Sequence, residues 1–146
     1  MLRVSGRLNP SLETRVAIVL VRRSSGLYFV HRRHPDKKTF PGLFGVGVGG
    51  KAEADESFKQ AAVRELSEEL NINAPLQYLF HFVYLPQPLP YEGAVYLAIH
   101  DGVVQPSESE FDAWDWREPE SILKEMQQGT YCPDTKVFFQ RTMGLM

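Results

Sequence analysis

An amphipathic helix that carries a cluster of glutamates lies in the middle of the sequence. Between residues 56 and 70, apolar side chains recur every four positions, the spacing that places them on one side of a helix. Asp55 can cap the first turn, and the segment NINAP that follows is typical of a helix end. Because residues three and four apart share a helix face, we expect Glu65, Glu68 and Glu69 to point the same way, beside the apolar stripe.

Strand-like runs precede and follow this helix. The runs RVAIVLVRR and LYFVHRR, joined by SSG, predict a hairpin, and later apolar or alternating runs predict further strands. Two segments that begin with proline predict C-terminal helices. The expected strands are 15–23, 27–33, 44–48, 76–85, 93–100 and 111–118, and the expected helices are 56–70, 119–129 and 133–143. This order indicates an α/β fold in a single domain, residues 1–146, with a mixed sheet sandwiched by helices.

Charge and cysteine content narrow the class of protein. The 146 residues carry a formal net charge of -2. The electrostatic field of so small a charge does not favour general binding to nucleic acid or to an anionic membrane. The start of the sequence lacks the apolar run of a signal peptide, and no stretch approaches the ~20 apolar residues that span a bilayer. Cys132, the single cysteine, cannot form an intramolecular disulfide. We therefore expect a cytoplasmic protein with no nucleic-acid or membrane partner.

The crowded glutamates need an explanation, because like charges at these spacings repel each other. One alternative is a solvated face, which is the usual role of a charge run. The other is a site for Mg²⁺ or Mn²⁺, which are held by carboxylates together with substrate phosphates and water. The glycine-rich turn before the helix favours the second alternative, since backbone groups of Gly49 and Gly50 could reach both a metal ion and a phosphate.

These residues resemble the Nudix box. That pattern is a glycine, five residues, a glutamate, seven residues and then R-E-U-x-E-E-x-G-U, where U is aliphatic; here Gly50, Glu56 and the run from Arg64 to Ile72 follow it. The one departure is Asn71, which stands in place of glycine. Asparagine also tolerates the left-handed conformation that ends a helix, so we interpret the change as conservative.

The resemblance implies a fold, a reaction and a set of roles. Nudix proteins are α/β/α sandwiches with a loop-helix-loop metal site, and they typically hydrolyse a diphosphate linked to another group, using Mg²⁺ or Mn²⁺. By this likeness Glu65 and Glu69 are the main metal ligands, together with Gly49, and Glu68 is a further ligand or positions water. The likeness also implies that Arg64 pairs with Glu56 and holds the helix against its loop.

The general base has more than one candidate. Glu68 is one; Glu110 is another, because many relatives carry a glutamate on the loop that faces the metal helix, and Glu108 competes with it. The alternative for Glu110 is an exposed acidic loop.

A narrower similarity concerns the segment RRHPDKKTFPGLFG, which resembles the branch of the superfamily that includes isopentenyl-diphosphate isomerase. In that branch a basic pair binds the substrate's diphosphate, and the equivalent residues here are Arg33 and Lys37, the alternative being ordinary solvated side chains. The isomerase also uses a cysteine and a histidine where this chain has Gly49 and Lys51, so hydrolysis is favoured over isomerisation.

The substrate and the assembly stay open at this point. Nucleoside diphosphate derivatives and isoprenoid-like diphosphates both suit the pattern, and Tyr84, Tyr91 and Phe40 could stack on a nucleobase. A different class is a catalytically silent module that binds a diphosphate ligand, although the retained box glutamates favour an enzyme. The resemblance leaves open a homodimer, because many relatives dimerise.

Overall fold

A computed structural model describes residues 12–146 of the chain, so most of the polar lead-in before the first strand lies outside the described residues. Its strands are β1 (Arg15–Arg22), β2 (Tyr28–Arg33), β3 (Phe44–Val46), β4 (Val48–Lys51), β5 (Gln77–Tyr84), β6 (Tyr91–Ile99) and β7 (Phe111–Arg117). Its helices are α1 (Phe58–Leu70), α2 (Pro119–Glu125) with the short 3-10 turn η1 (Met126–Gln128), and α3 (Pro133–Leu145). The expected order of strands and helices is confirmed.

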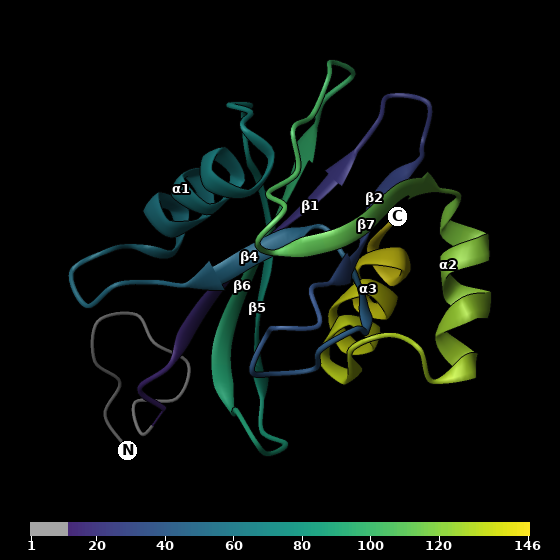
Figure 1. Ribbon diagram of the computed structural model, residues 1–146. Helices are drawn as coiled ribbons and strands as arrows, with labels where there is room; N and C mark the ends of the chain where they lie inside the picture. Colours follow the sequence, from purple (N-terminus) through teal and green to yellow (C-terminus); the bar gives the residue numbers. More distant parts are fainter. Residues whose placement is uncertain (1–11) are drawn as a thin grey trace.

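The described strands form one mixed sheet. Its main order is β3-β2-β1-β6-β5, with β4 paired to β1 and β7 paired to β2 (Figure 1). The pair β1·β6 is parallel, while β1·β4, β2·β7 and β5·β6 are antiparallel. The prediction of a mixed sheet is therefore confirmed.

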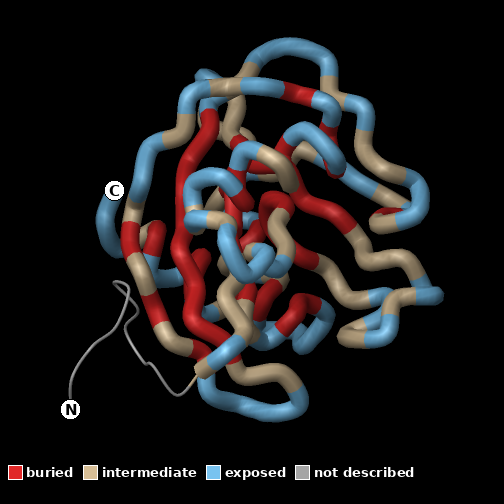
Figure 2. Tube along the Cα trace, turned by 90° about the vertical axis from the view of Figure 1, so that its left-hand side faces the viewer, coloured by how far each residue is buried: buried red, intermediate tan, exposed pale blue. Residues whose placement is uncertain are grey.

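Helices cover both faces of this sheet, and strand β1 shows why. Ala17 and Val19 pack in the apolar cluster that contains the buried face of α1, whereas Ile18 and Leu20 pack in the cluster that contains Phe139 of α3. Side chains along a strand point alternately to the two faces, so a strand that is apolar at every position needs cover on both. Figure 1 shows α1 on one side and α2 and α3 on the other, and Figure 2 shows long buried stretches of the chain running through the interior. This is the expected α/β/α arrangement.

Helix α1 begins two residues later than the sequence indicated. The cap is Ser57, whose hydroxyl accepts from the backbone N–H of Gln60 at 3.0 Å while the Gln60 side chain accepts from the Ser57 N–H at 2.8 Å. This reciprocal capping box satisfies two backbone donors, so the cap predicted at Asp55 was wrong and Glu56 precedes the helix. At the other end Asn71 adopts the left-handed conformation, with φ 56° and ψ 42°, as its place in the box predicted.

Two other predicted elements are divided. The strand expected at 44–48 is interrupted at Gly47, which has φ 80° and lies so close to the Val19 carbonyl that a side chain would collide with it. The helix expected at 119–129 ends as the 3-10 turn η1, and Gly129 follows it with φ 76°. Glycine in a backbone conformation that other residues rarely adopt therefore interrupts the strand and ends the helical segment.

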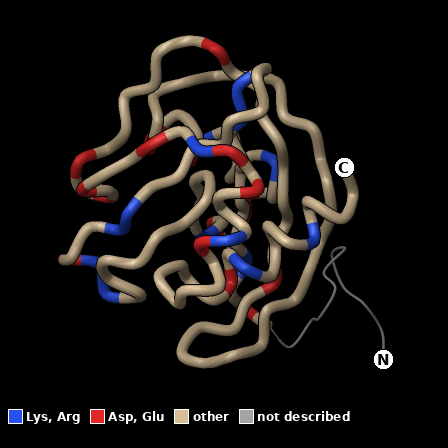
Figure 3. The backbone as a smooth tube through the Cα atoms, turned by 90° about the vertical axis from the view of Figure 1, so that its right-hand side faces the viewer, with Lys and Arg blue, Asp and Glu red and all other residues tan. Residues whose placement is uncertain are grey.

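The described residues contain no candidate membrane span, and their charges of both signs are mixed along the chain. None of the helices within residues 12–146 is both long enough and apolar enough to cross a bilayer. In Figure 3, the acidic and basic positions of the described chain lie interspersed. This distribution agrees with the weak net charge of the sequence.

Candidate active site

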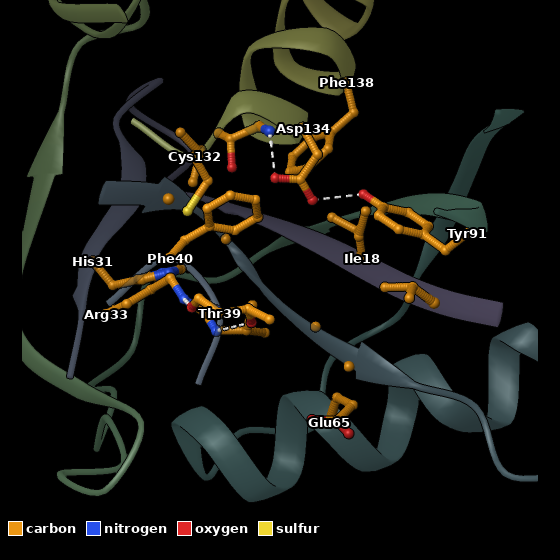
Figure 4. A pocket seen from close by; sticks show the side chains of 18 of the residues that line it. Ile18, His31, Arg33, Thr39, Phe40, Glu65, Tyr91, Cys132, Asp134 and Phe138 are labelled. Atoms are coloured by element: carbon orange, nitrogen blue, oxygen red, sulfur yellow. Dashed lines mark hydrogen bonds between the residues drawn. The ribbon is translucent and has the colours of Figure 1, made fainter. Parts of the chain in front are cut away.

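A pocket of about 400 Å³ lies at one side of the sheet, and segments distant in the sequence line it (Figure 4). Its size falls within the range of small-molecule sites. It brings together six of the residues predicted from the sequence: Arg33, Lys37, Gly49, Gly50, Glu65 and Glu110. The other predicted residues, Glu56, Arg64, Glu68 and Glu69, surround the α1 side of the pocket without lining it.

Glu65 and Glu69 form a close carboxylate pair on the buried side of α1. Glu69 is 5% exposed and the Glu65 side chain is 12% exposed. Burial, followed by hydrogen bonding to Glu65 and the charge of Glu110, raises the pKa of Glu69 well above its usual value. Gly50 completes the arrangement, because a Cβ at this position would collide with the Glu65 carboxylate. Two buried carboxylates that share a hydrogen bond require either a proton or a cation between them.

This donor set suits Mg²⁺ or Mn²⁺. Within residues 12–146, no three side chains of His, Cys, Asp or Glu gather into a group that could enclose a metal ion by themselves. Mg²⁺ does not need such a cage, since it is usually held by one or two carboxylates plus substrate phosphates and water. The Glu65–Glu69 pair beside the backbone of Gly49 and Gly50 therefore fits the smaller donor set that this ion requires.

Arg64 links the loop before α1 to the acidic face of the helix. Its guanidinium donates two hydrogen bonds of 2.8 Å to Glu56, one of 2.9 Å to Glu65 and one of 3.0 Å to the Lys51 carbonyl. The predicted Arg64–Glu56 pair is thus present in the structure. Hydrogen bonds from Arg64 and from the Glu53 N–H lower the pKa of Glu56 to about 2. Arg64 holds the Glu65 carboxylate in place while it fixes the loop.

Glu68 is far more exposed to solvent than Glu65 and Glu69. Its side chain is 59% exposed and accepts a hydrogen bond of 3.3 Å from the Arg64 guanidinium. It does not line the pocket. Glu68 thus shares the Arg64 guanidinium with Glu65, as expected for one helix face, but it lies at the exposed edge of that face, whereas Glu65 and Glu69 are largely buried. Glu108 is also exposed and does not line the pocket.

Glu110 reaches the pocket from the loop before β7. Both of its carboxylate oxygens accept from the Lys37 ammonium, at 3.0 and 2.9 Å. The loop is fixed from two sides, because the Ser107 N–H donates to the Glu69 carbonyl at 2.8 Å and the His34 N–H donates to the Glu110 carbonyl at 2.9 Å. Glu110 is therefore part of the pocket, and the alternative of a freely exposed acidic loop is wrong.

Arg33 and Lys37 both lie in the pocket, as expected for a phosphate-binding pair. Arg33 donates to the carbonyl of Thr39 at 2.9 Å and to its hydroxyl at 3.1 Å, and these bonds orient the guanidinium along the pocket wall. Nearby, burial lowers the pKa of His31 to about 3, so this side chain is neutral at physiological pH and adds no positive charge.

Four pocket residues come from a part of the chain to which the sequence assigned no site. They are Cys132, which caps α3, and Asp134, Thr135 and Phe138 in its first two turns. They reach the pocket because the Cys132 N–H donates to the Phe44 carbonyl at 2.8 Å. The sequence TYCPDTK suggested a helix start, but nothing in it indicated that β3 would hold this helix over the pocket. Burial raises the pKa of the Cys132 thiol to about 12, so it stays protonated.

The Glu56–Arg64 pair predicts a pH dependence of stability. The folded pKa of about 2 lies below the ordinary value of 4.5, so the pair's stabilisation is present above pH 4.5 and is lost as the pH falls toward 2. Glu56→Gln should therefore flatten the fall in the free energy of unfolding across this window, measured by urea unfolding at a series of pH values. The exposed neighbour Asp55→Asn is the matched control and should keep the wild-type slope. An unchanged slope in Glu56→Gln would contradict the pairing.

Fold and site together define an α/β protein with a buried acidic pair, an arginine network and basic side chains around one pocket. The profile of the NUDIX domain matches residues 12–136. The chain therefore belongs to the Nudix hydrolase family, whose members generally carry out metal-dependent hydrolysis of pyrophosphate bonds.

Named relatives and solved structures agree with this assignment. The chain is 31% identical to the Nudix hydrolase PA4841 of Pseudomonas aeruginosa over 83% of its length and 72% of the relative's. It is 35% identical to the Nudix hydrolase SCO1686 of Streptomyces coelicolor over 84% and 70%. The crystal structure of DR0079 from Deinococcus radiodurans superposes with a TM-score of 0.80 at 27% identity, covering 97% of this chain and 89% of that one. That of a MutT protein from Methanosarcina mazei gives 0.75 at 25%, covering 90% and 95%. These similarities specify no branch of the superfamily.

Proposed function

We propose that this protein hydrolyses a diphosphate linkage in a nucleoside diphosphate derivative or a related organic diphosphate, using Mg²⁺ or Mn²⁺. The observation that carries the proposal is the Glu65–Glu69 pair, in which Glu65 lies against Gly50 beside the pocket that contains Lys37 and Arg33. Negative and positive groups are thus placed at one end of the same cavity. A bound divalent cation would supply neutralisation of the diphosphate charge and acidification of a water molecule.

The side chains around the pocket bind the substrate, accept a proton or position other residues. Lys37 and Arg33 bind the diphosphate oxygens, and Lys37 must exchange its contact with Glu110 for one with phosphate as it does so. Glu110, once released, accepts the proton of the attacking water. Arg64 and Glu56 position Glu65 from behind and touch no substrate.

Isomerisation of an isoprenoid diphosphate is not favoured by this site. Gly49 and Lys51 occupy the positions where the isomerase likeness requires a thiol and an imidazole. Cys132 enters the pocket from another direction, but burial raises its pKa to about 12, which suits a structural thiol better than a proton-transfer group. The same buried cysteine suits a reducing compartment, so we retain the cytoplasm as the proposed location.

The proposal is tested by turnover on a substrate panel. The purified protein is incubated with nucleoside diphosphate derivatives and with isopentenyl diphosphate, in Mg²⁺, in Mn²⁺ and in chelator. We expect metal-dependent release of two phosphorylated products from at least one compound. Binding of metal and ligand without turnover on any compound would instead support the silent binding module.

A further inference from the structure

The pocket has a second polar end, formed by Asp134 in the first turn of α3 and Tyr91 at the start of β6. The Tyr91 hydroxyl donates to Asp134 Oδ2 at 2.6 Å, and the Thr135 N–H donates to Oδ1 at 3.0 Å. Figure 4 shows this Asp134 end across the pocket from Glu65. The two polar ends therefore face a single ligand-sized space.

The Asp134 end presents hydrogen-bond acceptors to the pocket. Burial, and then the charge of Asp134, raise the pKa of Tyr91, so the phenol keeps its proton and donates it to the carboxylate. Each carboxylate oxygen can accept about two hydrogen bonds, which leaves both Asp134 oxygens able to accept another. No Lys or Arg among residues 12–146 forms an ion pair with Asp134. The carboxylate thus stands ready for a donor carried by a ligand.

Apolar side chains, two of them aromatic, lie between the two polar ends. Phe138 and Ile18 contribute to the wall, and Phe40 enters from the loop after β2 (Figure 4). Phe40 has φ 49°, which is a rare backbone conformation for a bulky residue, and strained residues of this kind cluster at ligand-binding sites. An aromatic side chain held in this way over a pocket suits a planar ring in the ligand.

We infer that the Asp134 end binds a nucleobase that carries an exocyclic amino group, with the N–H donors of the base bonded to Asp134. This inference rests on the proposed diphosphate chemistry at the Glu65 end. A hydrocarbon tail in the same place would exclude water from Asp134 without replacing its hydrogen bonds, which is costly for a charged group. The pocket therefore favours nucleotides over isoprenoid diphosphates.

The bases differ in the groups that they would present to Asp134. Cytosine and guanine present amino donors at the hydrogen-bonding edge, which a carboxylate can accept. Uracil presents carbonyl oxygens on both sides of its single N–H. These oxygens carry partial negative charge and would be repelled by the Asp134 carboxylate. A site built to accept from an exocyclic amino group strongly rejects an analogue that lacks that group.

The experiment measures binding without turnover. Methylene-bridged diphosphates of cytidine and uridine, in which carbon replaces the bridging oxygen, are titrated into the protein in Mg²⁺ by calorimetry, with a methylene-bridged isopentenyl analogue as a third ligand. We expect the cytidine analogue to bind at least about tenfold more tightly than the uridine analogue. Asp134→Ala should bring the ratio to roughly one, because the distinguishing acceptor is lost.

Two further variants keep the result interpretable. Asp134→Asn retains an oxygen for the Thr135 N–H and adds a donor that uracil can accept, so it should shift the preference toward the uridine analogue. Gln140→Ala, exposed on the same helix, should leave the ratio as in the wild type. Equal affinities in the wild type, or a preference that survives Asp134→Ala, would overturn the inference even if the protein hydrolyses diphosphates. A cytidine preference that Asp134→Ala removes would uphold base recognition even if no diphosphate were cleaved.

Discussion

Glu69→Gln should lower turnover by at least about 10²–10³-fold and at the same time stabilise the metal-free protein. Turnover falls because the variant removes one carboxylate from the pair that would hold the cation. Stability rises because the raised pKa of Glu69 makes the metal-free fold less stable as the pH rises from 4.5 through the folded pKa, and glutamine carries no such charge. Both effects are measured at pH 8, by initial rate and by thermal unfolding in chelator.

The opposite signs distinguish a metal ligand from a structural residue. If Glu69 only supported the fold, the glutamine variant would unfold at a lower temperature and lose activity in proportion. Glu68→Gln is the matched control, since it removes an exposed carboxylate from the same helix. It should change neither the metal-free stability nor the stabilisation produced by added Mg²⁺. Loss of that stabilisation in Glu68→Gln but not in Glu69→Gln would contradict the assignment.

Glu110→Gln should reduce the maximal rate by about 10²–10⁴-fold, the range for loss of a general base, while substrate still binds. Glu110 lines the pocket and Glu68 does not, so the structure favours Glu110 of the two candidates. Glutamine preserves the shape of the side chain and leaves Lys37 free to bind phosphate. The measurement is the pH dependence of kcat, in which the acidic limb should disappear for Glu110→Gln and persist for Glu68→Gln. The reverse pattern would make Glu68 the base.

The sequence predicted the fold through features that are local. The four-residue apolar period of α1 and the left-handed tendency of Asn71 depend on neighbours within one or two helical turns. The position of the cap did not follow as clearly, since Asp55 and Ser57 are both good capping residues and only the partner Gln60 decides between them. The sequence did not indicate a break at Gly47, because Gly47 is one of five glycines between residues 42 and 50. The close approach of the Val19 carbonyl selects this one.

The site was predictable where the Nudix box specifies it and not elsewhere. Helical spacing places Glu68 with Glu65, but the packing of α1 on the sheet determines that only Glu65 and Glu69 are buried. Asp134 was missed because its place depends on contacts between β3 and a segment far along the chain. Pairing between distant segments is tertiary information, and no short motif in one sequence encodes it.

In the proposed reaction, water attacks a diphosphate bond at the pocket lined by Glu65 and Glu110, beside the buried Glu69. The most direct test runs the reaction in oxygen-18 water with a nucleoside diphosphate derivative and analyses both products by mass spectrometry. With Mg²⁺, we expect one labelled oxygen in one of the two phosphorylated products. We expect no labelled product in chelator or with Glu69→Gln. Label that appears equally in chelator, or with Glu69→Gln, would contradict the proposed reaction.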